Sequence, residues 1–319
     1  MIRHLISVVS ASLILSMPTY ANDSAAVMEA GGLRLVRDVP VEIVSEELYL
    51  SRSRIEVSYV FRAADDQGAS TLVAFPLPDY DLAWHGPEVL GGRGETVQSR
   101  SAFRVWADGV ELFPQLEVKA MRNGIDVTQS LANNGVPVGS LDYDAIMASL
   151  RSVPMGAREW FEQADIVHWY GNNEPEPRWT LKASYYWAQT FPPGRDVHVR
   201  HSYTPINGAF FINNAAQPGF DPAGYCMSEA EKAGLRNRLA GSENGAVLAT
   251  QVRYVLVTGK NWQGPIGRFK LIVDKENPND MVSLCVDGLK KISPTRFEKT
   301  VRDFVPQSDL DALFISAGP

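Results

Sequence analysis

Cysteines are few in this sequence, and the familiar catalytic motifs are missing. Only Cys226 and Cys285 occur in 319 residues, so the fold must depend on an apolar core and not on a dense disulfide framework. The motifs HExxH, GxSxG and GxxxxGK are all absent. His198 and His201 are three residues apart, a spacing that places them on opposite faces of a strand. We therefore expect no metal, no cofactor and no catalytic residue that a motif would identify.

Basic residues are too few for a nucleic-acid-binding protein. The sequence has 30 Lys and Arg against 37 Asp and Glu, a net charge of −7, whereas neutralising phosphates requires clustered basic side chains. The same balance argues against docking on anionic lipid. No apolar run after residue 21 reaches the roughly 20 residues of a membrane-spanning helix, so we expect no integral membrane segment in the mature chain.

The apolar run that is present, Leu5 to Met17, lies near the amino terminus after Arg3. A positive start, a short apolar middle and a small final residue are typical of an export signal, so we expect cleavage between Ala21 and Asn22. A retained anchor is the alternative, but the run is shorter than a membrane span. We expect a periplasmic or secreted protein, with a net charge of −8 once Arg3 is removed. Residues 22–32 are expected to form a polar lead-in.

Alternating polarity dominates the mature chain. Residues 55–61 and 179–191 alternate with a period of two, and Asp108-Gly109 and Asn123-Gly124 supply the positive φ of tight hairpins. Helical spacing is found at 142–150, 158–164 and 228–239. The sequence predicts a mainly β fold of two antiparallel β-sandwich-like units, with an inserted helical hairpin and a second short helical insertion.

We expect this fold to be divided into segments that follow the change of pattern. These are a signal peptide at 1–21, an N-terminal β-sandwich-like domain at 22–135, a helical insertion at 136–170 and a C-terminal β-rich domain at 171–319. Within the last segment, residues 208–224 are expected to form a loop and residues 251–258 a strand.

In an oxidising compartment, Cys226 and Cys285 most simply form one disulfide. The alternative is a nucleophilic Cys226 thiolate, because Ser228 and Glu231 form a capping-box pattern whose helix end would stabilise a negative charge. Titration of free thiols separates the two interpretations.

Aromatic side chains suggest where a ligand could bind. Trp169 and Tyr170 precede Gly171 and Asn172, which indicates an exposed aromatic loop with an amide beside it. Trp262 lies between glycine-containing turns and is a second candidate for ligand contact.

Several short strings resemble a family of secreted bacterial proteins, the domain-of-unknown-function family 4424. They include Gly31-Gly32-Leu33, Ser45-Glu46-Glu47-Leu48, Tyr59-Val60-Phe61, Phe191-Pro192-Pro193-Gly194, His201-Ser202-Tyr203-Thr204-Pro205, Asn261-Trp262-Gln263-Gly264-Pro265-Ile266 and the late Cys285. The resemblance spans nearly the whole mature chain but implies no activity or catalytic residues. Residues 41–78 also resemble the β-sandwich module of inter-α-trypsin inhibitor heavy chains, which would imply an interaction module.

These observations predict an exported, non-catalytic β-rich protein that binds a partner protein or a cell-envelope ligand such as a glycan. The alternative is a periplasmic hydrolase acting on glycans or peptides, with its site residues dispersed along the chain. A cleft holding two carboxylates roughly 5 to 9.5 Å apart, or a free Cys226 beside a histidine, would favour the hydrolase.

Overall fold

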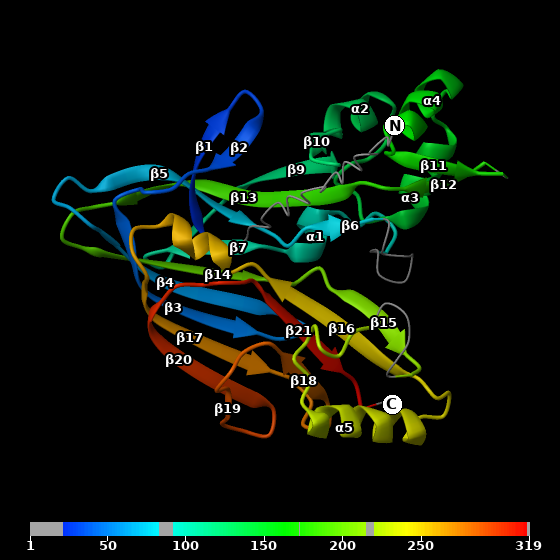
Figure 1. Cartoon of the computed structure of the whole chain (residues 1–319). Helices are drawn as coiled ribbons and strands as arrows, with labels where there is room; N and C mark the ends of the chain where they lie inside the picture. The colour runs from blue at the N-terminus through cyan, green and yellow to red at the C-terminus, as the bar shows by residue number, and fades with distance from the viewer. Residues whose placement is uncertain (1–21, 83–91, 172, 215–219, 318–319) are drawn as a thin grey trace, which may run out of the picture.

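Two large β-sheets lie face to face and enclose the main core (Figure 1). The computed structural model describes residues 22–82, 92–171, 173–214 and 220–317. The seven-stranded sheet has the order β10 (Ile125–Asp126), β9 (Gln115–Arg122), β13 (Thr180–Phe191), β5 (Ala69–Pro76), β1 (Ser24–Glu29) and β2 (Gly32–Leu35), with β6 (Tyr80–Asp81) beside β13. The predicted mainly β class is confirmed.

The eight-stranded sheet forms the opposite layer. Its order is β19 (Lys290–Lys291), β20 (Arg296–Phe304), β17 (Ile266–Asp274), β3 (Val41–Leu50), β4 (Ile55–Ala63), β14 (Asp196–Tyr203), β7 (Arg104–Ala107) and β8 (Val110–Leu112). Neighbouring strands are antiparallel, except that β17 and β3 run parallel. Ile55, Val57, Tyr59 and Phe61 are buried as the alternation predicts.

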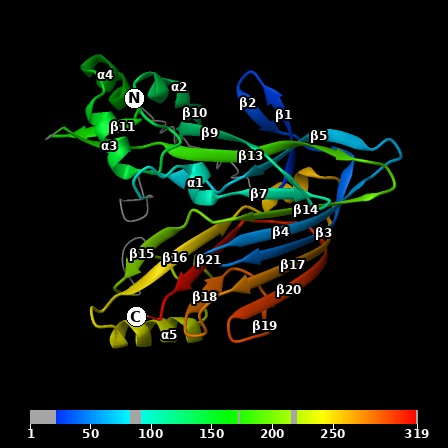
Figure 2. The ribbon, with the colours of Figure 1, turned by 180° about the vertical axis from the view of Figure 1, so that it is seen from behind.

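A four-stranded sheet is covered on both faces. Its order is β15 (Gly208–Ile212), β16 (Val247–Tyr254), β21 (Leu310–Ile315) and β18 (Met281–Leu284). Along β21, Ala312 and Phe314 enter the main core, whereas Leu313 and Ile315 enter a smaller core. Helix α5 (Glu229–Gly241) contributes Leu235 to the smaller core, and both views show it beside this sheet (Figures 1 and 2). Because successive side chains point to opposite faces, this one sheet contributes side chains to both cores.

The remaining helices gather mostly at one end of the seven-stranded sheet (Figure 2). They are α1 (Val97–Ser101), α2 (Thr128–Asn133), α3 (Tyr143–Arg151) and α4 (Met155–Gln163), followed by the hairpin of β11 (Val167–Tyr170) and β12 (Glu174–Pro177). The predicted helical hairpin is confirmed, because Asp142 caps α3 and Ile146 and Leu150 are buried. None of the helices in the described residues is long and apolar enough to cross a membrane.

Three local predictions were wrong. Residues 22–32 are not a lead-in, because β1 pairs with β5 and its first residues are buried. Residues 208–212 form β15 and not a loop, since they pair with β16. The strand expected at 251–258 ends at Tyr254 and is followed by a 3₁₀ turn, η1 (Val257–Asn261). In each case pairing with a distant segment decides the local structure.

Strands from both sides of the helical hairpin share the large sheets. β13 pairs with β5 and β9, and β14 and β17 pair with β4 and β3. The segments 22–135 and 171–319 therefore contribute to the same sheets, and their division into domains stays a prediction.

Candidate functional site

An open groove of about 570 Å³ lies on the outer face of the eight-stranded sheet. Two rows of cross-strand neighbours build it, because alternate residues of each strand point outward. One row runs from Arg268 through Ser45 and Val60 to His198. This row thus crosses four strands, of which only β3 and β4 are consecutive in sequence.

The second row runs from Lys270 through Glu47 and Ser58 to Arg200, and then to Trp106. Ser45, Val60 and Ser58, in the middle of the two rows, are short and leave a hollow between the longer side chains at the ends, whereas Glu47 pairs with Lys270. The groove therefore has a largely hydroxyl-lined floor with basic and aromatic walls.

Trp106 positions the cation on one wall. The guanidinium of Arg200 lies 4.0 Å from the centre of the Trp106 ring, within cation–π distance. Arg104 lies 4.7 Å from the same ring, and its Nε donates to Glu111 Oε1 at 2.7 Å. Arg200, in contrast, has no carboxylate partner within the described part of the chain, so its N–H groups are available to a ligand.

The other wall is also basic. Lys270 Nζ lies 3.2 Å from Glu47 Oε2 and 3.3 Å from Glu298 Oε2. Burial opposes the charge of Lys270, but the two carboxylates outweigh it and raise the pKa of this amine, so it stays protonated. Arg268 makes no ion pair with any described residue. The groove can therefore hold an acidic group between Arg200 and Arg268, beside serine hydroxyls.

The aromatic residues expected to contact a ligand lie elsewhere. Trp169 and Tyr170 are in β11, at the end of the molecule where α3 and α4 lie (Figure 1). Trp169 packs beside Phe161 and Arg158, and Tyr170 is 54% exposed. Asn172 falls outside the described residues. Ligand contact by this hairpin stays a prediction.

Trp262 occupies a core position and not a ligand surface. It is 3% exposed, its ring lies 5.0 Å from the Phe61 ring, and its indole N–H donates to the Asp23 carbonyl at 2.7 Å. The glycine-containing turns beside it suggested exposure, but the sheets close over the ring.

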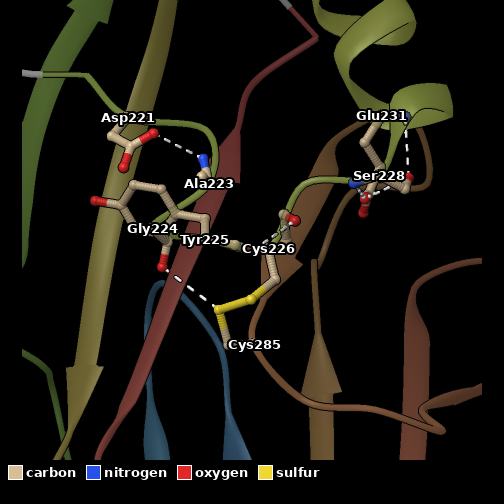
Figure 3. The surroundings of a disulfide bond; sticks show 9 residues. Asp221, Ala223, Gly224, Tyr225, Cys226, Ser228, Glu231 and Cys285 are labelled. Atoms are coloured by element: carbon tan, nitrogen blue, oxygen red, sulfur yellow. Dashed lines mark hydrogen bonds between the residues drawn. A yellow bond between two sulfur atoms is a disulfide. The ribbon is translucent and has the colours of Figure 1, made fainter.

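The predicted disulfide between Cys226 and Cys285 is confirmed (Figure 3). It joins the segment before α5 to the end of β18, and the predicted capping box of Ser228 and Glu231 lies next to it (Figure 3). With both sulfurs bonded, Cys226 has no thiolate, so the hypothesis of a nucleophilic cysteine is wrong for this state.

A fully buried polar cluster lies between the two large sheets. His201 Nε2 is 3.2 Å from Asp23 Oδ2, and both residues are 0% exposed. Glu46 Oε2 accepts a hydrogen bond of 3.1 Å from the Asn22 side chain, whose oxygen accepts one from Tyr59. Ala21, on the other side of the expected cleavage point, lies outside the described residues. Because solvent does not reach this cluster, it is not a site for a substrate.

No group of three or more His, Cys, Asp or Glu residues in the described ranges is arranged to hold a metal ion. No signal in the sequence identified the groove, because its residues come from five strands and each resembles an ordinary exposed strand position.

Comparison with known proteins found a match to one protein family and distant similarity to solved structures. A protein described as a candidate nutrient-binding protein from Legionella pneumophila is 16% identical, with a TM-score of 0.42 over 93% of this chain and 72% of that one. An M1 zinc metallopeptidase from Deinococcus radiodurans is 10% identical, with a TM-score of 0.25 over 88% of this chain and 43% of that one. At these TM-scores neither likeness carries an argument about function.

No curated protein matches this chain. The likeness of residues 41–78 to the inter-α-trypsin inhibitor heavy-chain module stays a prediction. A family model does match, and it covers residues 21–313. On that match the chain belongs to the family described as domain of unknown function (DUF4424).

Proposed function

We propose that this protein is an exported, non-catalytic binding protein whose groove holds an acidic saccharide of the cell envelope. The supporting observation is the Arg200 guanidinium, held over Trp106 without a carboxylate partner, with Arg268 on the opposite wall. A planar guanidinium donates paired hydrogen bonds to a carboxylate or phosphate group. The protein as a whole is acidic, so the basic groove is a local site at which a negatively charged ligand is favoured.

The floor of the groove favours a saccharide over a protein partner. Protein interfaces have an apolar centre rich in aromatic residues. Here the floor presents the hydroxyls of Ser45 and Ser58 and only one apolar side chain, Val60. Hydroxyls suit the many donors and acceptors of a sugar ring.

The carboxylate in the groove supports binding and not hydrolysis. Glu47 is held by Lys270 at 3.2 Å, and the neighbouring Glu46 side chain points into the core. Glu298, the second carboxylate on this wall, is held by the same Lys270 at 3.3 Å. A glycosidase of the usual kind needs one of its two carboxyl groups to donate a proton to the leaving group. Two carboxylates that are both engaged with one ammonium group do not meet that requirement.

The test is titration calorimetry with acidic and neutral oligosaccharides of equal length. We expect the acidic series to bind and its affinity to fall with added salt. Arg200→Glu or Arg268→Glu should each weaken binding by roughly tenfold or more, because a charge-assisted hydrogen bond contributes about 1.5–3 kcal/mol. The control is Arg34→Glu, an exposed position on β2 of the other sheet, which should leave affinity unchanged.

Equal binding of neutral and acidic sugars, or equal effects of the groove and control variants, would refute the proposal. Binding of an acidic protein segment but of no saccharide would assign the groove to a partner protein instead.

A further inference from the structure

The buried cluster around Asn22 contains more carboxylates than cations. Asp23 and Glu46 are both fully buried, and among the described residues only His201 supplies a basic group in contact with either. Glu46 Oε1 has no hydrogen-bond partner in the described part of the chain. A buried carboxylate oxygen without a partner is costly, which indicates that a positive donor belongs beside it.

The pKa of Glu46 also reflects the lack of a positive charge beside it. Burial raises the pKa of Glu46 to about 8; Asn22 and, to a smaller extent, the Tyr254 hydroxyl oppose this rise, and the charge of Asp23 adds to it. The phenols of Tyr59 and Tyr254, whose hydroxyls are 3.1 Å apart, contribute no positive charge.

The main-chain nitrogen of Asn22 lies inside this cluster. It donates to the hydroxyl of Thr258, which in turn donates to the Asn22 carbonyl at 2.6 Å. The side chain of the same residue reaches Glu46 Oε2 at 3.1 Å. A positive charge on the Asn22 nitrogen would therefore lie within the cluster that holds more carboxylates than cations.

We propose that the Ala21–Asn22 peptide bond is hydrolysed on export and that the new α-ammonium group of Asn22 pairs with Glu46 inside the closed core. Hydrolysis adds one water across the bond, so Ala21 leaves with a carboxylate and Asn22 keeps an amine that takes up a proton. The ammonium group then supplies a positive charge for Glu46, while His201 remains the partner of Asp23. A terminal ammonium has three N–H donors, enough for Thr258 and for the free oxygen of Glu46.

This pairing makes removal of the signal a step in completing the fold. Any residue before Asn22 removes the charge from the nitrogen and moves it along the chain. The processed chain thus gains a buried ion pair that the precursor lacks. The inference does not rest on saccharide binding, since the cluster lies on the opposite face of the sheet from the groove.

The first experiment locates the amine and measures its access. Sequencing the amino terminus of the protein isolated from the exported fraction should give Asn22. Reductive methylation of the native protein, followed by mass spectrometry of the N-terminal peptide, should modify the α-amine at least tenfold more slowly than in urea. Surface lysines serve as the internal control. Another first residue, or equal rates in both states, would overturn the proposal.

The second experiment tests the pairing. Two chains are compared, one beginning with Asn22 and one with a single glycine before it. Glu46→Gln should lower the folding equilibrium constant of the first chain by about a hundredfold and that of the extended chain by less than tenfold. Glu47→Gln, one residue along on the outer face, should have the same small effect in both chains.

An equal cost of Glu46→Gln in the two chains would overturn the pairing. Should the extended chain fail to fold, the comparison is made on the Asn22 chain alone. There, Glu46→Gln should increase the methylation rate of the α-amine at least tenfold while Glu47→Gln leaves it unchanged. An unchanged rate in Glu46→Gln would count against the proposal.

Discussion

Replacing His201 with glutamine removes the basic partner of a carboxylate that solvent cannot reach. Both His201 and Asp23 are 0% exposed, and the atoms His201 Nε2 and Asp23 Oδ2 are 3.2 Å apart. The imidazole ring is surrounded by aromatic rings, with Phe75 at 4.9 Å and Phe103 at 5.3 Å between centres. The surroundings therefore offer Asp23 little compensation when the imidazole is lost.

The expected cost follows from this burial. Breaking a buried ion pair by removing one partner typically costs about 3–5 kcal/mol, because the remaining charge is left uncompensated. The lower end applies to His201→Gln, since an amide donates a hydrogen bond to the carboxylate. Burial already raises the pKa of Asp23, with the charge and hydrogen bond of His201 opposing the rise. Adding Asp23→Asn removes the stranded charge and should restore roughly 1–3 kcal/mol of the loss.

The assay is urea unfolding at pH 7, followed by circular dichroism and tryptophan fluorescence. His198→Gln is the matched control, because His198 is three residues away on the exposed face of the same strand. That variant should change the free energy of unfolding by no more than about 0.5 kcal/mol. The reasoning is refuted if His201→Gln is as mild as the control, or if the double variant is no more stable than His201→Gln.

Two further results are expected. Replacing both Cys226 and Cys285 with serine should lower the free energy of unfolding by about 4 kcal/mol, since the bond spans 59 residues of sequence; thermal unfolding with and without reductant checks this, and identical midpoints would contradict it. In the chain with glycine before Asn22, the folded pKa of Glu46, about 8, lies above the usual 4.5. The contribution of Glu46 to the free energy of unfolding of this chain should therefore be greatest below pH 4.5 and fall as the pH rises toward 8. The raised pKa of Asp23 acts in the same direction. Urea unfolding midpoints that rise with pH over this range would show that burial does not raise the pKa of Glu46 as described.

Local signals predicted the hairpins well, because turn chemistry is decided by a few adjacent residues. Asp108 and Gly109 have φ of 48° and 81°, and Asn123 and Gly124 have φ of 51° and 78°. These positive values are the ones for which Asp-Gly and Asn-Gly were expected. The capped helix after Cys226 was predicted for the same reason, since its capping box is contained in four residues.

Long-range pairing could not be predicted in this way. Residues 24–26 are Ser-Ala-Ala, with no bulky apolar side chain to indicate a strand, yet they pair with β5 and are buried. The parallel contact of β3 with β17 joins segments more than 200 residues apart, between Ser45 and Arg268. Both depend on packing that no short window of sequence contains.

A single irregularity in β3 connects the outer groove with the inner cluster. Up to Ile43 the odd-numbered residues of β3 are buried, but after the register shift between Ile43 and Ser45 the buried residues are the even-numbered Glu46, Leu48 and Leu50. The shift therefore turns a glutamate into the core and places Ser45 in the floor of the groove.

The neighbouring strand accommodates this bulge through a glycine. A Cβ on Gly267 would lie 2.7 Å from the Val44 carbonyl oxygen, so only glycine lets β17 approach β3 at that point. Without the bulge, the alternation would direct Ser45 and Glu47 inward and leave Glu46 in solvent. The acidic residue that we pair with the Asn22 nitrogen and the floor that we assign to the saccharide thus follow from one backbone feature, although each has its own experimental test.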